Sequence, residues 1–168
     1  MQIRLAGVEP ESIVDGPGYR FAVFTQGCLH GCPGCHNPQT HDVCGGYLAD
    51  TGEIAARLCD NPLVRGVTLS GGEPMMQAAA LCEIARAAHE KGLDVWCYTG
   101  YTLEALLEEG REDRLRLLRL VDVLVDGPYI ARERSLDIAY RGSKNQRLID
   151  MPRTLREGRV YPYTPPAW

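Results

Sequence analysis

Residues 19–37 read Tyr19-Arg20-Phe21-Ala22-Val23-Phe24-Thr25-Gln26-Gly27-Cys28-Leu29-His30-Gly31-Cys32-Pro33-Gly34-Cys35-His36-Asn37. The first eight residues are rich in aromatic and β-branched side chains, which predicts a strand that ends at Gly27. Three cysteines follow on a short, glycine-rich loop with the spacing Cys-x3-Cys-x2-Cys. A [4Fe–4S] cluster usually takes four cysteine ligands. Cys28, Cys32 and Cys35 are therefore candidate metal ligands that would leave one iron of such a cluster open.

The cysteine triplet also fits other kinds of site. Cys-x2-Cys pairs often hold structural zinc, whose ligands are thiolates and imidazoles. Four further side chains lie close enough in sequence to complete a zinc tetrahedron: His30, His36, His41 and Cys44. A thioredoxin-like redox pair needs only two cysteines, and a four-cysteine electron-transfer cluster could recruit Cys44. The triplet alone leaves these alternatives open.

The composition indicates an ordinary globular protein. At 168 residues, with 45% hydrophobic and 24% charged residues, we expect a single domain over residues 1–168. The formal net charge of −4 disfavours a protein that binds nucleic acid by neutralising phosphates. No apolar run approaches the ~20 residues that span a bilayer, and no signal peptide is recognisable. We therefore expect a cytoplasmic protein, without membrane or nucleic-acid partners, whose seven cysteines are thiols and metal ligands.

Cysteines and charges outside the loop have ordinary structural interpretations. Cys59, Cys82 and Cys97 fall inside apolar periodic segments, so we expect them to be buried as small hydrophobic side chains. Arginines alternate with acidic residues over residues 108–119, which favours a solvated helix face over a basic binding patch.

Short apolar runs alternate with helical segments along the chain. We expect helices at about residues 50–61, 75–91 and 102–120, strands at 64–69, 93–98, 121–125 and 146–149, and an edge strand at 2–8 outside the repeat. Strands that alternate with helices predict a parallel sheet in an α/β fold. A closed (β/α) barrel needs about 250 residues. This chain therefore predicts an open, partial barrel of four or five strand–helix units.

Glycine-rich and polar segments fall at the carboxyl ends of the expected strands, where α/β folds bind their ligands. The second of them reads Ser70-Gly71-Gly72-Glu73-Pro74. By itself it is typical of a tight turn between a strand and a helix. Two glycines also let the backbone approach a ligand closely, because no Cβ intervenes. Backbone carbonyls there could accept hydrogen bonds from an ammonium group.

The cysteine triplet and Ser70-Gly71-Gly72-Glu73-Pro74, separated by one strand–helix unit, resemble the two motifs of the radical S-adenosylmethionine enzymes. The resemblance implies a [4Fe–4S] cluster on Cys28, Cys32 and Cys35, whose open iron chelates S-adenosylmethionine. It implies that Gly71, Gly72 and Glu73 hold the methionyl amino group, and that Ser70 and Pro74 shape this turn. No side chain beyond the cluster and cofactor is then expected to be catalytic.

Four further segments narrow the resemblance: residues 14–20, 32–37, 122–129 and 141–147. They resemble the glycyl-radical-enzyme activases, and among these the family that activates anaerobic ribonucleoside-triphosphate reductases, over about residues 12–150. The resemblance implies that one electron cleaves S-adenosylmethionine to methionine and a 5′-deoxyadenosyl radical. That radical takes a hydrogen atom from a glycine Cα in the glycyl-radical subunit of the reductase. A flavodoxin or ferredoxin would be a suitable one-electron donor.

The remaining site residues have weaker signals. Many radical S-adenosylmethionine enzymes carry an aromatic residue before the third cysteine, where this chain has Gly34. His36 and Asn37 are therefore candidates for contact with the adenine, although His36 is equally explained by loop packing. Thr99 and Asp126, at the ends of two expected strands, either reach the ribose, the methionine or a cation, or form caps and turns. Residues 145–147 and the tail of residues 161–168 are structural elements or parts of a cofactor or partner surface.

Two other functions remain open at this point. A radical enzyme that acts on a small molecule, such as a 7-carboxy-7-deazaguanine synthase, would share the short partial barrel. A non-catalytic zinc or iron–sulfur binding module would share only the cysteine loop. Metal and sulfide content separates the second of these from an enzyme, and the substrate separates the first.

Overall fold

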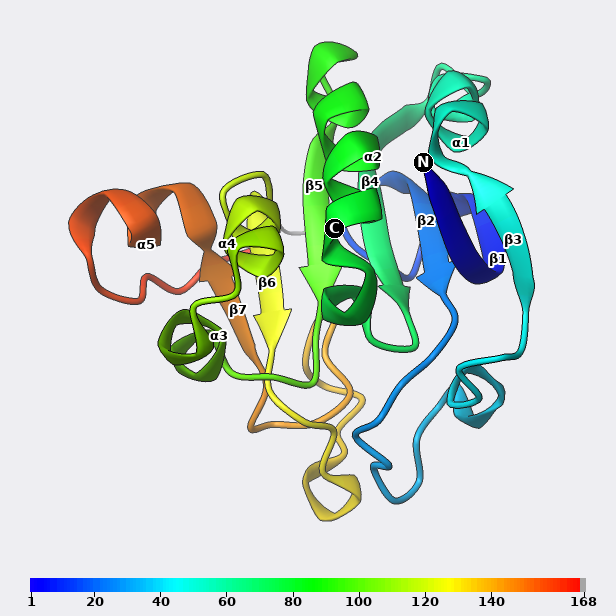
Figure 1. The fold of residues 1–168 in the computed structure, drawn as a ribbon. Helices are drawn as coiled ribbons and strands as arrows, with labels where there is room; N and C mark the ends of the chain where they lie inside the picture. The colour runs from blue at the N-terminus through cyan, green and yellow to red at the C-terminus, as the bar shows by residue number, and fades with distance from the viewer. Residues whose placement is uncertain (167–168) are drawn as a thin grey trace.

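A computed structural model describes residues 1–166 and shows one mixed sheet with helices packed on it (Figure 1). Its seven strands lie in the order β3-β1-β2-β4-β5-β6-β7. Their bounds are Gln2–Ser12 for β1, Tyr19–Thr25 for β2, Tyr47–Asp50 for β3, Val64–Gly71 for β4, Asp94–Tyr98 for β5, Val123–Asp126 for β6 and Arg147–Asp150 for β7. The four strands β2, β4, β5 and β6 run parallel, and β1, β3 and β7 pair antiparallel with their neighbours. The sheet is open, because β3 and β7 form its two edges.

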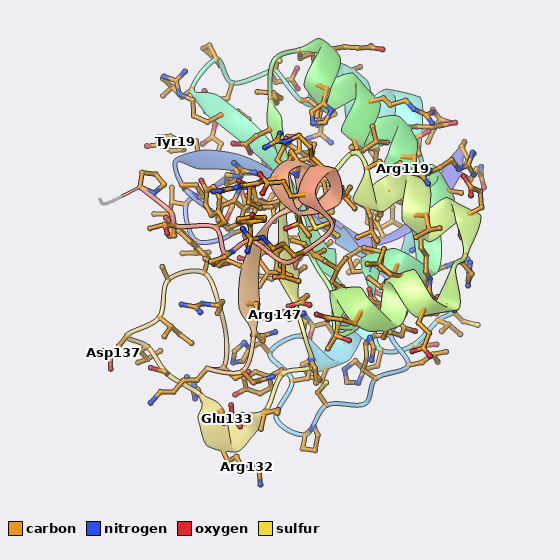
Figure 2. All side chains as sticks on the ribbon, turned by 90° about the vertical axis from the view of Figure 1, so that its left-hand side faces the viewer. Tyr19, Arg119, Arg132, Glu133, Asp137 and Arg147 are labelled. Carbon is orange, nitrogen blue, oxygen red and sulfur yellow. The ribbon has the colours of Figure 1, made fainter. Side chains whose placement is uncertain are left out.

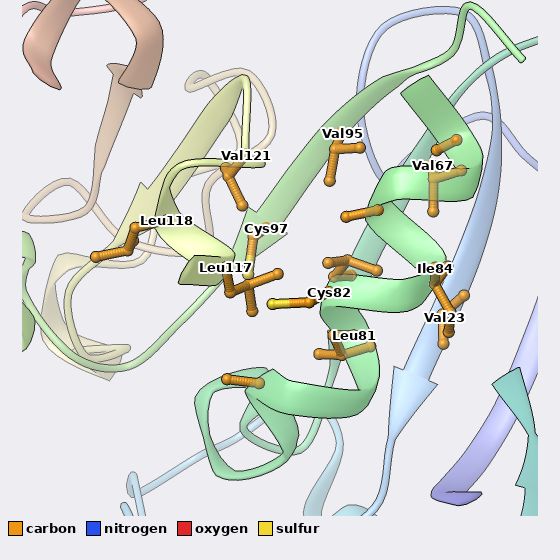
Figure 3. Close-up of a cluster of buried hydrophobic side chains, with 14 of the residues drawn as sticks. Val23, Val67, Leu81, Cys82, Ile84, Val95, Cys97, Leu117, Leu118 and Val121 are labelled. Atoms are coloured by element: carbon orange, nitrogen blue, oxygen red, sulfur yellow. The ribbon is translucent and has the colours of Figure 1, made fainter. Parts of the chain in front are cut away.

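Helices α1 to α4 lie between the parallel strands in the chain and cover one face of the sheet, and α5 follows β7 (Figure 1). Their bounds are Thr51–Arg57 for α1, Ala78–Glu90 for α2, Leu103–Glu109 for α3, Glu112–Leu118 for α4 and Met151–Glu157 for α5, with short 3-10 turns at Pro38–Thr40 (η1), Pro74–Gln77 (η2) and Ala131–Glu133 (η3). Helix α2 packs against both α1 and α4. The main core lies between these helices and the sheet, where Leu81, Ile84 and Leu117 meet Val23 and Val67 (Figure 3).

The other face of the sheet carries a smaller aromatic cluster. Side chains alternate between the faces of a strand, so Trp96 lies opposite to the core residues on either side of it in β5. Tyr140 and Tyr163 meet the Trp96 ring edge-on, with centroid distances of 5.4 and 5.5 Å. Tyr163 also donates its backbone N–H to Leu148 O at 2.8 Å. The tail thus covers the outer edge of the sheet over residues 161–163, as one interpretation predicted, whereas Ala167 and Trp168 lie outside the described residues.

The edges of the sheet differ from the sequence-based expectation. The N-terminal strand β1 is not an edge strand, because β3, which the sequence did not predict, pairs along its outer side. Strand β7 runs antiparallel to β6, so the parallel repeat has four strands and no fifth unit. The link between β6 and β7 contains only the short turn η3, whereas a parallel return needs a full crossover.

One expected helix, at residues 102–120, is two helices. Gly110 adopts φ +67° and caps the end of α3, donating its backbone N–H to Leu106 O. A left-handed residue ends a helix, and glycine adopts it without steric cost. By contrast, the expected start at Asp50 is confirmed, because its side chain accepts a hydrogen bond from Gly52 N at 2.8 Å. Helix α5 was not predicted.

Two predictions about burial are wrong. Cys59 is exposed, whereas Cys82 and Cys97 are buried as predicted (Figure 3). Arg114, expected on a solvated face, is only 4% exposed. Its guanidinium donates to Met75 O at 2.9 Å and pairs with Glu109 at 2.7 Å. Arg114 lies on the buried side of α4, which faces η2, and it satisfies the Met75 carbonyl there. The charge pattern of the sequence does not contain this tertiary contact.

Within residues 1–166, the helices are all too short or too polar to cross a membrane.

Candidate functional site

A cavity of about 640 Å³ lies at the carboxyl ends of the parallel strands. Its walls come from residues 13–15 after β1, from the loops after β2, β4, β5 and β6, and from residues 135–146. The predicted site residues that line it are Cys28, Cys32, Cys35, His36, Asn37, Ser70, Gly71, Gly72 and Thr99. The tertiary structure thus brings the cysteine loop and the glycine turn to one cavity, as predicted.

The cysteine loop is held by backbone hydrogen bonds to η1. Gly27 donates its N–H to Thr40 O at 2.8 Å, and Cys28 donates to His41 O at 3.2 Å. Cys28, Cys32 and Cys35 are half-buried free thiols, whereas Cys44 is exposed and lies outside the lining of the cavity. Burial raises the pKa of the Cys28 thiol.

Three half-buried thiols that line one cavity have the donor chemistry of an iron–sulfur cluster. In such a cluster each thiolate binds a different iron, whereas thiolates on one zinc ion lie about 3.8 Å apart, because each Zn–S bond is about 2.3 Å. Within residues 1–166, no three His, Cys, Asp or Glu side chains are grouped to hold a single metal ion. The cysteines present fit the cluster by their chemistry and their common cavity.

The glycine turn at the end of β4 packs directly on the end of β2. A Cβ on Gly71, which has φ +99°, would lie 2.4 Å from Thr25 N, and one on Gly72 would lie 2.4 Å from Gly27 O. Gly72 also donates its N–H to Thr25 O at 2.8 Å. Both positions therefore need glycine because the backbone of this turn touches the backbone at the end of β2. This requirement exists whether or not a ligand also approaches from the cavity.

Glu73 is a buried hub that joins three loops. Its carboxylate, 1% exposed, accepts hydrogen bonds from Thr99 Oγ1 and Gly100 N, both at 2.9 Å, and from Met75 N at 2.9 Å. His30 Nε2 lies 2.6 Å from the same carboxylate. Glu73 does not line the cavity, and Pro74 is buried behind it at the start of η2. The sequence suggested His30 only as a zinc ligand. Its position between two of the cysteines was the one feature that could have indicated a role in holding the cysteine loop.

The two polar residues at the ends of β5 and β6 have structural partners. Thr99 lines the cavity, but its hydroxyl donates to Glu73. Asp126 is buried, accepts from Leu103 N at 2.8 Å at the start of α3, and pairs with Arg147. These contacts agree with the capping and turn interpretation. The hydrogen bonds that Arg147 donates to Asp126 and Glu104 raise the pKa of its guanidinium. Arg147 is the first residue of β7 and is labelled in Figure 2.

The aromatic rings at this end of the sheet come from two loops. Gly34 has φ +75°, a conformation that residues with a Cβ rarely adopt, so an aromatic residue is disfavoured at this position. His36 packs instead on Tyr129, with ring centroids 4.8 Å apart. The sequence marks Tyr129 only as the last residue of the resembling segment 122–129. Its place in the loop after the expected strand at 121–125 was the one signal of a site residue. Asn37 stays within the loop, where its carbonyl accepts from Thr40 Oγ1 at 2.7 Å.

Comparison with known proteins agrees with this geometry. A family model described as a 4Fe-4S single cluster domain matches residues 14–149. A Vibrio cholerae protein is 39% identical over 147 residues, which cover 82% of this chain and 91% of the relative. An Escherichia coli K12 protein is 34% identical over 145 residues, with coverage of 82% and 92%, and an Enterobacteria phage T4 protein is 34% identical over 151 residues, with coverage of 84% and 90%. All three relatives are named anaerobic ribonucleoside-triphosphate reductase-activating protein. The chain therefore belongs to the family of anaerobic ribonucleoside-triphosphate reductase-activating proteins.

Proposed function

We propose that this chain is a radical S-adenosylmethionine activase that generates a glycyl radical on an anaerobic ribonucleoside-triphosphate reductase. Cys28, Cys32 and Cys35 would hold a [4Fe–4S] cluster, and that cluster would supply the single electron needed for the reductive cleavage of S-adenosylmethionine in the same cavity. The observation that carries the proposal is the meeting of three free thiols and the Gly71–Gly72 turn in one cavity.

The chain's own residues supply ligands, orientation and shape. Cys28, Cys32 and Cys35 would each hold one iron and leave a fourth iron without a protein ligand. The backbone of residues 70–72 faces the same cavity, and its carbonyls can accept hydrogen bonds from the methionyl ammonium group. Glu73 would position these loops without contacting the cofactor, because its buried carboxylate is hydrogen-bonded to His30, Thr99 and Gly100. The cofactor performs the difficult chemistry, and the protein provides geometry and excludes water.

We infer that the four parallel strands form an open partial barrel of the radical S-adenosylmethionine type, with residues 1–168 acting as one domain. Four successive parallel strands with their ligand end at one cavity support this inference. An open sheet does not surround its ligand, so one side of the cavity stays open to a large partner.

Exposed aliphatic side chains at the cavity support a protein partner. Ile13, Val14 and Leu136 line it and are 56%, 73% and 88% exposed. A reductase segment that presents a glycine would cover these side chains and keep water away from the radical. A one-electron donor such as a flavodoxin or ferredoxin would supply the electron, and the cytoplasm would supply both proteins.

The test uses anaerobically reconstituted protein with a reductant, S-adenosylmethionine and the reductase. We expect about four iron and four sulfide per chain, a glycyl radical in the electron paramagnetic resonance spectrum, and slow, abortive cofactor cleavage without the reductase. With that glycine doubly deuterated at Cα, deuterium should appear in 5′-deoxyadenosine. Transfer from a small nucleoside precursor alone would replace the proposal with a small-molecule radical enzyme, and zinc without sulfide would replace it with a binding module.

A further inference from the structure

The corner of the cavity beside Cys35 carries two aromatic rings. Tyr129 follows β6, His36 follows the third cysteine, and both line the cavity. Their ring centroids lie 4.8 Å apart, with an interplanar angle of 49°. Two aromatic side chains from loops that are far apart in the sequence therefore meet where the cysteine loop ends.

Gly142 leaves room for the Tyr129 ring, whereas a Cβ on Gly34 would make only an ordinary contact with it. A Cβ on Gly142 would lie 3.0 Å from Tyr129 Cδ2 and 3.4 Å from His36 Cε1, and one on Gly34 would lie 3.7 Å from Tyr129 Cε1. The ring thus sits between the cysteine loop and the segment that precedes β7. A side chain at position 142 would press on both rings.

Hydrogen bonds hold the backbone around this ring in place. Gln146 Nε2 donates to Gly127 O at 3.1 Å, and its Oε1 accepts from Gly142 N at 2.9 Å. Asn145 Nδ2 donates to Pro128 O at 2.7 Å. These two side chains fix the segments on either side of the ring before any ligand binds. A preorganised aromatic surface loses little conformational entropy when a flat ligand stacks on it.

We propose that Tyr129, together with His36, is the platform on which the adenine of S-adenosylmethionine stacks. The inference rests on the proposed function and names a residue that contacts its cofactor. Stacking between a nucleobase and one aromatic side chain changes affinity by a factor of about 5 to 150 on alanine substitution. The cavity, at about 640 Å³, lies in the usual range for small-molecule sites. The methionyl end is then left to the glycine turn of the same cavity.

The test compares two probes on anaerobically reconstituted protein. S-adenosylhomocysteine carries the adenine and is not cleaved, whereas methionine lacks it. Calorimetry measures the affinity for S-adenosylhomocysteine, and equilibrium dialysis measures the affinity for methionine. Iron analysis confirms that each variant holds its cluster. We expect Tyr129→Ala to weaken S-adenosylhomocysteine binding at least about fivefold with methionine binding and iron content unchanged, and Tyr129→Phe to stay within about twofold of the parent, because the π face remains.

Tyr19→Ala is the matched control. Tyr19 is an exposed tyrosine at the start of β2, at the other end of the molecule from Arg132 and Glu133 of the loop after β6 (Figure 2). It should leave both affinities unchanged. If Tyr129→Ala does not fold, Tyr129→Leu keeps the bulk without the π face and carries the same expectation.

Equal affinity of the Tyr129→Ala or Tyr129→Leu protein for S-adenosylhomocysteine, with iron intact, overturns the inference. A parallel loss of methionine binding also overturns it, because the whole cavity would then have changed. A parent protein that assembles no iron–sulfur cluster and binds neither probe instead removes the proposed function. The two failures are therefore distinguishable.

Discussion

His30 Nε2 lies 2.6 Å from Glu73 Oε2, and this contact joins the cysteine loop to the loop after β4. The same carboxylate accepts hydrogen bonds from Thr99 and Gly100 at the end of β5. Gly100 also has no room for a Cβ, which would lie 2.5 Å from the His30 ring. One buried acid thus fixes the loops after three neighbouring parallel strands, and with them the relative position of the thiols and the glycine turn.

We expect His30→Ala to retain its iron but to bind S-adenosylmethionine more weakly, because the cysteine loop loses its anchor. The free energy of unfolding should fall by about 1–3 kcal/mol, since the buried Glu73 carboxylate loses one of its four hydrogen-bond partners. Calorimetry and urea denaturation measure the two effects, and His30→Gln should restore part of each.

The matched control is His89→Ala, which removes a half-exposed histidine paired with Asp122 at 3.0 Å, away from the cavity. It should cost less than about 1 kcal/mol and leave cofactor affinity unchanged. If the two alanine variants lose cofactor affinity equally, the His30–Glu73 contact has no positioning role.

Alanine at Cys28, Cys32 or Cys35 should abolish the cluster and all cleavage of S-adenosylmethionine, because each thiolate would hold one iron. Cys44→Ala and Cys59→Ala are the controls, since both side chains are exposed. They should keep full iron content and change stability by no more than about 0.5 kcal/mol. Iron and sulfide analysis decides the outcome; a Cys44→Ala protein without cluster, beside a Cys35→Ala protein with one, would reassign the ligands.

Valine at Gly72 should lower both iron content and cofactor affinity. The new Cβ would lie 2.4 Å from Gly27 O, so the residue that precedes Cys28 must move. Gly7→Ala is the control, because no atom lies within 4 Å of its Cβ position. A Gly72→Val protein that folds with full iron and loses only cofactor affinity would show that the ligand, and not the β2 backbone, sets the need for glycine there.

Asp126→Asn should destabilise the fold without changing affinity for S-adenosylmethionine. The buried carboxylate accepts from Leu103 N and pairs with Arg147, so the loss should be about 1–3 kcal/mol in urea denaturation. Glu104→Gln removes the exposed partner of the same arginine and should cost less than about 1 kcal/mol. Weaker cofactor binding by the Asp126→Asn protein at unchanged stability would place this carboxylate at the ligand.

Removal of iron by a chelator should leave the fold intact. The three loop cysteines lie outside both buried apolar clusters, which hold the sheet and helices together. The far-ultraviolet circular dichroism spectrum should therefore be unchanged, while binding of S-adenosylmethionine is lost. Cooperative unfolding on chelation would mean that the metal, and not the core, stabilises the domain.

The sequence predicted those parts of the fold that depend on local pattern. Alternating apolar and helical segments located the four parallel strands and α2, because hydrophobic periodicity acts over a few neighbouring residues. The spacing of the cysteines and the glycine turn identified the cavity, since the carboxyl ends of parallel strands must meet at one edge. Helix α2 ends at Glu90, close to the predicted end at residue 91, and Gly92 follows it with φ +73°.

Only the tertiary structure decided the contacts between residues far apart in the chain. The pairing of β3 with β1, the burial of Arg114 and the direction of β7 depend on which surfaces pack together, and local propensity does not contain that information. The same holds within the site. His30 meets Glu73, and Tyr129 meets His36, because separate loops converge at one end of the sheet. The sequence determined which chemistry the cavity can hold, and the packing of the loops determined which side chains position it.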